Sequence, residues 1–381
     1  MKSSKLFLVA FISAMFLASC SKDEIEVPRY NSKGIYDSGV LIINQGNSAG
    51  SSISNISFDL ATVNNDIFNL ANPSVPFGVY AQDMIFNGDK AYTTMGGSNK
   101  IQIFNRYTML SLGSISNNLK NPRYMIIANN KLYVSNFGNY DPDNSDDFIS
   151  VFDVNTNAFL KTIAVSGGSA DKMIWNAGKL YVAQGGDSGT GNNIKVIDTT
   201  TDTVIKTILV SGNPNALEIS NGALWVMCTG YSSYPNPANE SNGILVKLNL
   251  ATDALIIAYS FPAIYTTPTS GAPVQNFEHP KNFVVNSGYG YYTINSKMYK
   301  VNLSPTTTVV LPGNVIVTNA GTAPNAIAIR NDKIFVADAT DYNSGGFVSI
   351  YSLGVYTDSP ALGTLLKTKT VGIAPSGFYF N

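Results

Sequence analysis

The 381-residue sequence predicts an all-β fold, a seven-bladed β-propeller of four-stranded antiparallel blades in which the C-terminal strand pairs into the first blade. Two observations support this prediction. Short apolar runs bounded by Asn, Gly or Asp recur along the chain, which is the signal of strands and hairpins. Within them, an aromatic or aliphatic anchor residue returns at blade-like spacing. One such unit cannot bury both of its faces, so neighbouring copies must stack against one another.

The chain starts with a targeting segment. Lys2 and Lys5 precede an apolar run at 6–17 that is too short to span a bilayer, and Leu-Ala-Ser-Cys at 17–20 forms a small-residue cleavage site. This order resembles a bacterial lipoprotein signal. We therefore expect removal of residues 1–19 and lipidation of Cys20; the alternative is an ordinary secretory signal with a chance cysteine.

Residues 20–37 form the predicted tether between the lipidated cysteine and the repeats, because most of them are polar or charged. Ser21 stands where an aspartate would resemble an inner-membrane retention signal. The Asp23-Glu24 pair resembles the export signal of some Gram-negative surface lipoproteins. These resemblances imply an outer-membrane lipoprotein exposed at the cell surface, with a plain solvated linker as the alternative.

Composition excludes some classes of function. Charged residues make up 13% of the chain and the net charge is −1, with no basic run, which argues against binding nucleic acid through its phosphates. No later stretch is long and apolar enough for a transmembrane helix. With Cys20 lipidated, Cys228 has no partner for a disulfide, so stability must come from sheet packing.

The blades are predicted by two regularities. The anchors are Ile42, Tyr92, Tyr133, Tyr181, Trp225, Tyr291 and Phe335, with spacings of 50, 41, 48, 44, 66 and 44 residues. Eight residues before each of the last six anchors lies an apolar residue: Met84, Met125, Met173, Leu217, Phe283 and Ile327. Turns rich in Asn and Gly join these two strands. A third strand follows in each copy, at 53–58, 101–104, 148–152, 194–197, 244–248, 298–301 and 347–351.

The first copy lacks its innermost strand. Residues 374–380 match residues 323–329 in position and pattern, so we expect the tail to pair beside residues 40–43 and to close a ring that spans residues 38–381. Closure removes exposed sheet edges. Rings of six or eight blades are the alternatives.

The repeat resembles a known family. KLYVSN at 131–136 and KLYVAQ at 179–184, followed by IKVID at 194–198 and VIKTILVSGNP at 204–214, are similar to the YVTN repeat of surface-layer and YncE-like seven-bladed propellers. A lipidated propeller of this kind resembles surface lipoproteins that sit over TonB-dependent transporters, the cobalamin-capturing BtuG-type proteins among them. The repeat itself carries no ligand information, because its residues are turn and core residues.

One face of the ring is expected to bind. The loops after the second strands and the links between blades share that face and are long, whereas the turns on the opposite face are predicted to be two or three residues. The long loops carry Tyr80, Phe137, Tyr140, Tyr231, Tyr234, Tyr265, Phe277 and Tyr342. These rings suit a binding rim; alternatively, they pack the loops onto their own blades.

A second candidate set lies nearer the axis. The residue two positions before each inner-strand apolar residue is polar: Gln82, Arg123, Asp171, Asn215, Lys281, Asn325 and, from the tail, Ser376. We expect these side chains around the mouth of the central channel, where they would hydrogen-bond a ligand lying across it. The alternative is a channel mouth that is simply hydrated.

A metal site is a further possibility in one acidic loop. Asp141, Asp143, Ser145 and Asp147 alternate like the oxygen ligands of a calcium loop. The segment lacks the central Gly and the distant bidentate Glu of an EF-hand, and a solvated acidic loop is the alternative. No other cofactor is predicted.

Catalytic signals are missing. His279 is the only histidine, no Gly-x-Ser-x-Gly elbow accompanies it, and no phosphate-binding Gly loop is present. We therefore expect a non-catalytic lipoprotein that captures a nutrient, a corrinoid or a glycan, for a TonB-dependent transporter. The alternatives are a surface-layer or adhesion protein and a carbohydrate-active enzyme that uses acids such as Asp171 or Asp338.

Overall fold

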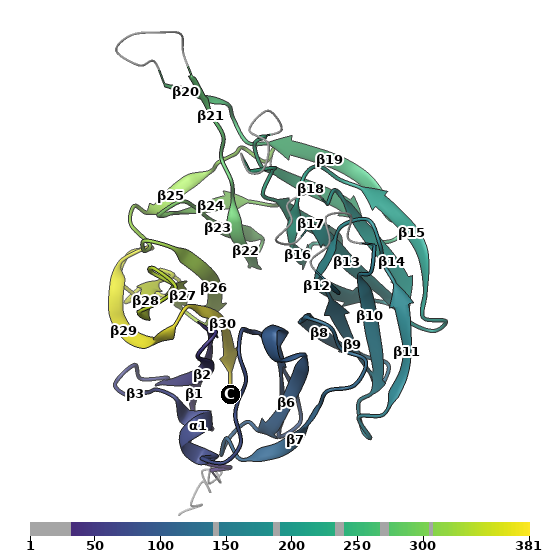
Figure 1. Cartoon of the computed structure of the whole chain (residues 1–381). Helices are drawn as coiled ribbons and strands as arrows, with labels where there is room; N and C mark the ends of the chain where they lie inside the picture. Colours follow the sequence, from purple (N-terminus) through teal and green to yellow (C-terminus); the bar gives the residue numbers. More distant parts are fainter. Residues whose placement is uncertain (1–31, 140–144, 186–190, 233–239, 267–273, 305–307) are drawn as a thin grey trace, which may run out of the picture. The chain divides into compact units, whose positions relative to one another are not determined.

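The computed structural model describes residues 32–139, 145–185, 191–232, 240–266, 274–304 and 308–381. Gly34–Asn381 form one compact unit, which begins four residues before the predicted start of the ring. Within it, seven four-stranded antiparallel sheets are arranged as the blades of a propeller (Figure 1), as the sequence predicts. The part of the chain that is described holds no helix of the length and hydropathy needed to cross a bilayer.

Each blade runs from an inner strand at the axis to an outer edge strand. The inner strands, from the first blade to the seventh, are β30 (Pro375–Phe380), β4 (Ala81–Asn87), β8 (Pro122–Ala128), β12 (Ser169–Asn176), β16 (Pro214–Ser220), β22 (Lys281–Asn286) and β26 (Pro324–Arg330). The second strands are β1 (Gly39–Asn47), β5 (Lys90–Met95), β9 (Lys131–Asn136), β13 (Lys179–Gly185), β17 (Ala223–Cys228), β23 (Tyr289–Ile294) and β27 (Lys333–Asp338).

The third strands agree with the predicted ranges to within a few residues. They are β2 (Gly50–Ser57), β6 (Lys100–Asn105), β10 (Phe148–Asp153), β14 (Asn193–Asp198), β18 (Ile244–Asn249), β24 (Lys297–Asn302) and β28 (Gly345–Ser352). The outer strands are β3 (Val63–Asn64), β7 (Ser111–Ile115), β11 (Phe159–Ala164), β15 (Thr203–Leu209), β19 (Ala254–Ser260), β25 (Asn314–Val317) and β29 (Leu365–Ile373).

The tail closes the ring. Strand β30 pairs antiparallel with β1, and Ile42 lies opposite Phe378 in the register. The backbone N–H of Asn381 donates to the carbonyl of Gly39 at 3.0 Å, and Arg106 Nε donates to Asn381 Oδ1 at 2.7 Å. The predicted pairing of the tail with residues 40–43 is therefore confirmed.

The core lies between neighbouring sheets. Tyr92 packs against Leu132 of the next blade, Tyr133 against Leu180, and all three anchor-type aromatic side chains at 92, 133 and 181 are buried. Burying such rings contributes roughly 1.5–3 kcal/mol each. Each of the seven core clusters combines residues of two neighbouring blades, as expected for a repeat that cannot fold alone.

The lysine and tyrosine of the KLYV sequences also hold the blades together, which the sequence did not reveal. Lys131 Nζ lies 2.7 Å from Asp202 Oδ2, and the Tyr133 hydroxyl donates to Asp202 Oδ1 at 2.6 Å. Asp202 belongs to the β14–β15 turn of the following blade. Tyr181 donates to Asp253 in the same way at 2.6 Å, so the contact repeats one blade further along.

Three segments depart from the regular plan. In the first blade β3 is two residues long and is followed by a short helix, α1 (Ile67–Ala71), and a 3₁₀ turn, η1 (Gly96–Ser98), follows β5. The hairpin of β20 (Ile264–Thr266) and β21 (Val274–Asn276) projects from the ring (Figure 1). The predicted length of two or three residues for turns on the opposite face is confirmed for the turns that join first to second strands in the second to seventh blades. It is wrong for the connections from third to fourth strands, which are all four residues or longer, with 303–313 and 353–364 the longest.

Candidate functional site

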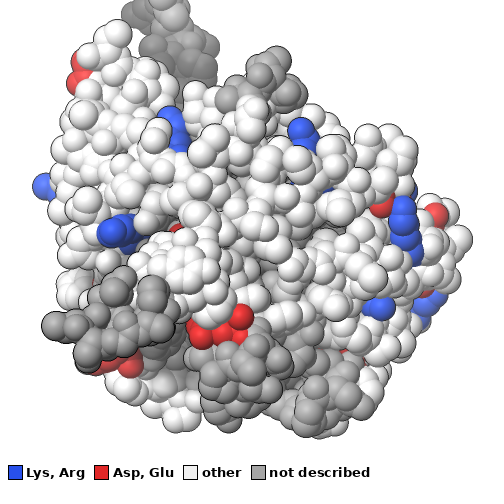
Figure 2. Space-filling model, turned by 90° about the horizontal axis from the view of Figure 1, so that it is seen from above, with Lys and Arg blue, Asp and Glu red and all other residues white. Residues whose placement is uncertain are grey.

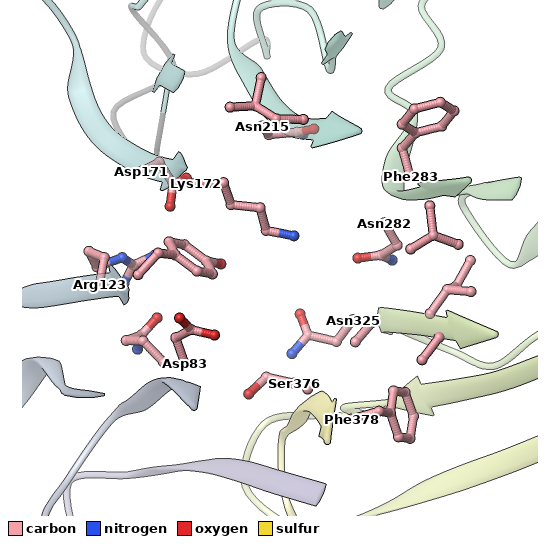
Figure 3. A pocket seen from close by; sticks show the side chains of 18 of the residues that line it. Asp83, Arg123, Asp171, Lys172, Asn215, Asn282, Phe283, Asn325, Ser376 and Phe378 are labelled. Atoms are coloured by element: carbon pink, nitrogen blue, oxygen red, sulfur yellow. The ribbon is translucent and has the colours of Figure 1, made fainter. Parts of the chain in front are cut away.

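A cavity of about 430 Å³ lies on the propeller axis and is lined by the inner strands of all seven blades (Figure 3). The structure brings every member of the predicted polar set to this one cavity. These residues, named the polar ring here, are Gln82, Arg123, Asp171, Asn215, Lys281, Asn325 and Ser376. That they bind a ligand stays a prediction.

An irregularity in strand pairing turns these side chains toward the axis. In the second blade the register shifts between Ala81 and Met84, so Gln82 lies in a bulge, and the inner strands of the other blades shift at the same place. Bulges redirect side chains and recur beside functional sites. The sixth blade differs, because Lys281 is paired with Thr293 there and Asn282 occupies the bulge.

Hydrogen bonds from blade to blade fix the ring. Asn282 Nδ2 donates to the carbonyl of Pro324 at 2.9 Å, and Asn325 Nδ2 donates to the carbonyl of Pro375 at 3.2 Å. Asn282 has a positive φ of 59°, a conformation that asparagine tolerates better than most residues. These amides therefore hold adjacent inner strands at a fixed separation, which gives a ligand a rigid site.

Two side-chain oxygens of the polar ring lack a hydrogen-bond donor among the described residues. The side-chain oxygens Asn215 Oδ1 and Ser376 Oγ are buried and have no hydrogen-bond partner among the described residues. A buried polar atom without a partner costs roughly 1–3 kcal/mol, so a bound molecule that supplies a donor would be favoured.

Asp83 and Lys172 add charge to the axial cavity, and the charge of Lys172 also acts on Glu218; sequence reasoning did not assign Asp83 or Lys172 to this cavity. Burial raises the pKa of Asp83 to about 6 and that of Glu218 to about 7, and the positive charge of Lys172 opposes both shifts. The Lys172 ammonium group extends into the cavity (Figure 3). Asp83 directly follows Gln82 in the sequence, and Lys172 directly follows Asp171. The residue after each member of the polar ring was therefore the sequence signal that could have located these two charges.

Two further cavities adjoin the polar ring. One of about 510 Å³ lies over the first three blades and shares Gln82 and Arg123 with the axial cavity. The other, of about 610 Å³, lies over the fourth to seventh blades and shares Asp171, Asn215 and Lys281 with it. The polar ring therefore connects the axis with both halves of the long-loop face.

The predicted aromatic rim is found in part. Tyr80 lines the 510 Å³ cavity with 39% of its surface exposed, and Tyr342 lines the 610 Å³ cavity with 47% exposed. Phe137 is buried beneath the guanidinium of Arg123, 4.3 Å from the ring centroid, so it supports the polar ring and does not form a rim.

The other predicted aromatic residues contribute less to these cavities. Tyr231, Tyr265 and Phe277 line none of the three, and the ring of Tyr231 lies against Gly212. Tyr140 and Tyr234 lie outside the described residues.

The proposed calcium ligands are also only partly described. Asp141 and Asp143 lie outside the described residues, and Ser145 is exposed. Asp147 is buried, and its Oδ2 accepts a hydrogen bond from the Ala170 N–H at 2.8 Å, so this carboxylate fastens the link between the third and fourth blades. Among the described residues no three His, Cys, Asp or Glu side chains gather as a metal site would require.

His279 and Cys228 are engaged in the fold. His279 Nδ1 lies 3.1 Å from the carbonyl oxygen of Thr229, and its Nε2 lies 3.2 Å from Glu240 Oε1. Cys228 is fully buried, and burial raises the pKa of its thiol far above the ordinary value, which leaves it a poor nucleophile.

Charge is sparse on the surface. Lys, Arg, Asp and Glu side chains are few and separated by broad uncharged areas on the face drawn in Figure 2. This agrees with a charged fraction of 13%. The charges of the polar ring and axial cavity are therefore concentrated relative to the surface around them.

Comparison with known proteins adds a family and confirms the fold. A family profile described as "Domain of unknown function (DUF5074)" matches residues 38–272. No curated protein matches the chain. A quinonprotein alcohol dehydrogenase-like protein from Bacteroides thetaiotaomicron is similar in structure, with a TM-score of 0.58 and 13% identity over 91% of this chain and 78% of that one.

Two other solved structures are similar. The hydrazine synthase of Kuenenia stuttgartiensis has a TM-score of 0.57 and 15% identity, over 76% of this chain and 85% of that chain. The computationally designed protein Ika8 has a TM-score of 0.52 and 10% identity, over 88% of each chain. At these identities the likeness shows the fold alone.

Proposed function

Since the chain belongs to the family described as domain of unknown function DUF5074, we propose its role from the site itself: a non-catalytic binding protein that captures a nutrient in the axial cavity and on the adjoining face. The observation that carries this proposal is the polar ring, one side chain per blade around a single cavity. Rigid scaffolds with converging polar groups are typical of binding sites.

The chemistry of the ring favours a large ligand of mixed polarity. Amide, hydroxyl, carboxylate and cationic groups all face the cavities, and Tyr80 and Tyr342 add partly exposed aromatic surface. A corrinoid, whose flat ring system carries many amides, suits this combination, and a glycan is the second choice. Cobalamin in particular rests on the resemblance of a lipidated propeller of this kind to BtuG-type proteins.

The proposal extends to the cell surface, and the signals at the start of the chain are its support. Cys20 would carry the lipid anchor at the outer membrane, and a TonB-dependent transporter would receive the nutrient. The engagement of His279 and the burial of Cys228 support a role without catalysis, because one candidate base and one candidate nucleophile are committed to the fold.

Calorimetry with cobalamin tests the proposal. We expect binding at micromolar concentration or below. Gln82→Leu should bind at least tenfold more weakly, because it removes a polar-ring amide that donates to the carbonyl of Tyr80 at 3.1 Å. Asn314→Leu is the matched control, because Asn314 lies exposed on the outer strand β25. Absence of binding by cobalamin and by a panel of glycans would refute the capture role.

A further inference from the structure

The 510 Å³ cavity over the first three blades presents hydrogen-bond donors and positive charge. Lys120, Asn121 and Arg123, close together on the link into β8 and its first residues, all line it. The rest of its lining is amide, glycine and tyrosine, and no carboxylate belongs to its lining among the described residues. The axial cavity differs, since Asp83 and Asp171 line it together with its cations.

Asn121 supplies the most specific observation. Its side chain is 8% exposed, and its Nδ2 has no hydrogen-bond partner among the described residues. Its backbone is held from both sides, because its N–H donates to Asn99 Oδ1 at 2.6 Å and its carbonyl accepts from the Phe137 N–H at 3.2 Å. A buried donor without an acceptor is costly, so the site favours a ligand that brings one.

The two cations flank this donor. Arg123 is 8% exposed, and its guanidinium lies over the Phe137 ring, which keeps the group in one orientation. Lys120 is exposed and makes no ion pair among the described residues. The nearby carboxylate of Asp146 is engaged, because its Oδ2 accepts hydrogen bonds from the N–H and Nδ2 of Asn139 at 2.8 and 2.7 Å.

Tyr80 adds an aromatic surface to the same cavity. Its backbone has a positive φ of 54°, which is uncommon for a bulky residue and marks a functional constraint or strain. One side of its ring lies on Gly97, where an added Cβ would come within 2.6 Å of Tyr80 Cδ2. The glycine therefore lets the ring lie close to η1 with the rest of its surface exposed.

From these observations we propose that the 510 Å³ cavity is a subsite for an anionic group of the captured ligand, a carboxylate or a phosphodiester, next to a flat apolar surface that stacks on Tyr80. This rests on the proposed capture function and deepens it. Lys120, Asn121 Nδ2 and Arg123 bind the anion. The acidic sugar of a glycan and the nucleotide phosphodiester of a corrinoid are two sources of this chemistry.

Calorimetry with four probes on the full chain distinguishes these sources. Trigalacturonate and cobalamin carry the anionic group, whereas cellotriose and cobinamide lack it. We expect the anionic member of at least one pair to bind at least tenfold more tightly than its counterpart, with an affinity that falls as salt concentration rises. The pair that shows the difference identifies the source.

Variants locate the subsite. Lys120→Gln and Asn121→Asp should each weaken binding of the anionic probe about tenfold or more, as expected for loss of a hydrogen bond to a charged group. Asparagine and aspartate both tolerate the positive φ of 50° at position 121, so the second variant keeps the backbone. Lys367→Gln, on the outer strand β29, is the charge-matched control and should bind like the parent chain.

The outcomes separate the two proposals. If probes bind with no preference for the anionic member, or if Lys120→Gln and Asn121→Asp bind as well as Lys367→Gln, the subsite is refuted while capture stands. If none of the four probes binds, and the wider glycan panel also fails, both proposals fall. Circular dichroism of each variant confirms that lost binding does not reflect unfolding.

Discussion

The hydroxyl of Tyr379 donates a hydrogen bond to Asp83 Oδ1 at 3.0 Å, which joins the last strand of the chain to the inner strand of the second blade. The other carboxylate oxygen, Oδ2, accepts from the Met125 N–H of the third blade at 2.8 Å. One carboxylate thus connects three inner strands at the place where the tail closes the ring. This polar contact lies beside the β1–β30 ladder at the closure of the ring.

Tyr379→Phe should lower the free energy of unfolding by about 1–3 kcal/mol, because it leaves a partly buried carboxylate oxygen of Asp83 without its donor. Urea denaturation measures the change. Tyr356→Phe is the control, since Tyr356 is 57% exposed and should change stability little. Equal stability of the two variants would show that the contact contributes nothing to closure.

Stability should decrease as pH rises from about 4 to about 7. Asp83 and Glu218 have pKa values of about 6 and about 7 in the folded chain, above the ordinary 3.8 and 4.5. Between these values the folded state holds more protons than the unfolded state, so the free energy of unfolding falls with pH by at most about 1.4 kcal/mol per pH unit for each group.

Urea denaturation at several pH values checks this slope in the parent chain and in Asp83→Asn and Glu218→Gln, each of which should flatten it. Asp341→Asn is the control, because the pKa of Asp341 is lowered to about 2, below this window. A parent chain whose stability is constant or rises between pH 4 and 7 would contradict the assignment of both carboxyl groups.

Asp202→Ala should destabilise the chain by about 2–4 kcal/mol, because it leaves Lys131 and the buried Tyr133 hydroxyl without their acceptor. Asp253→Ala should cost a similar amount, since the same contact repeats in the following blade. The exposed Asp358→Ala is the comparison. If only one of the first two variants is destabilised, the contact is not a general device of the repeat.

Cys20→Ser should release the protein from the membrane. Loss of the acyl chains removes roughly 0.8 kcal/mol of membrane affinity per buried CH₂. Fractionation of cells, together with metabolic labelling by a fatty-acid analogue, measures this, and Cys228→Ser should retain both anchor and label. A labelled Cys20→Ser chain would refute lipidation at this position.

Much of the fold was predictable because its determinants are local. Asn and Gly residues set the hairpin turns, apolar alternation set the strands, and the likeness of residues 374–380 to residues 323–329 indicated closure. The polar ring was predicted from a constant offset, because each of its members lies two positions before the apolar residue of an inner strand. What the offset did not reveal is the extra bulge residue, which puts Asn282 beside Lys281 at the axis in the sixth blade.

The sequence by itself therefore predicted the blades, a ring of seven of them, and the seven residues of the polar ring. Only the tertiary structure decided that Phe137 is buried under Arg123, that Asp202 binds Tyr133 of the preceding blade, and that Asn121 joins Lys120 in one cavity. The physical reason is that repeats encode pairing within a sheet, whereas burial and hydrogen bonding between sheets depend on how separate blades pack together.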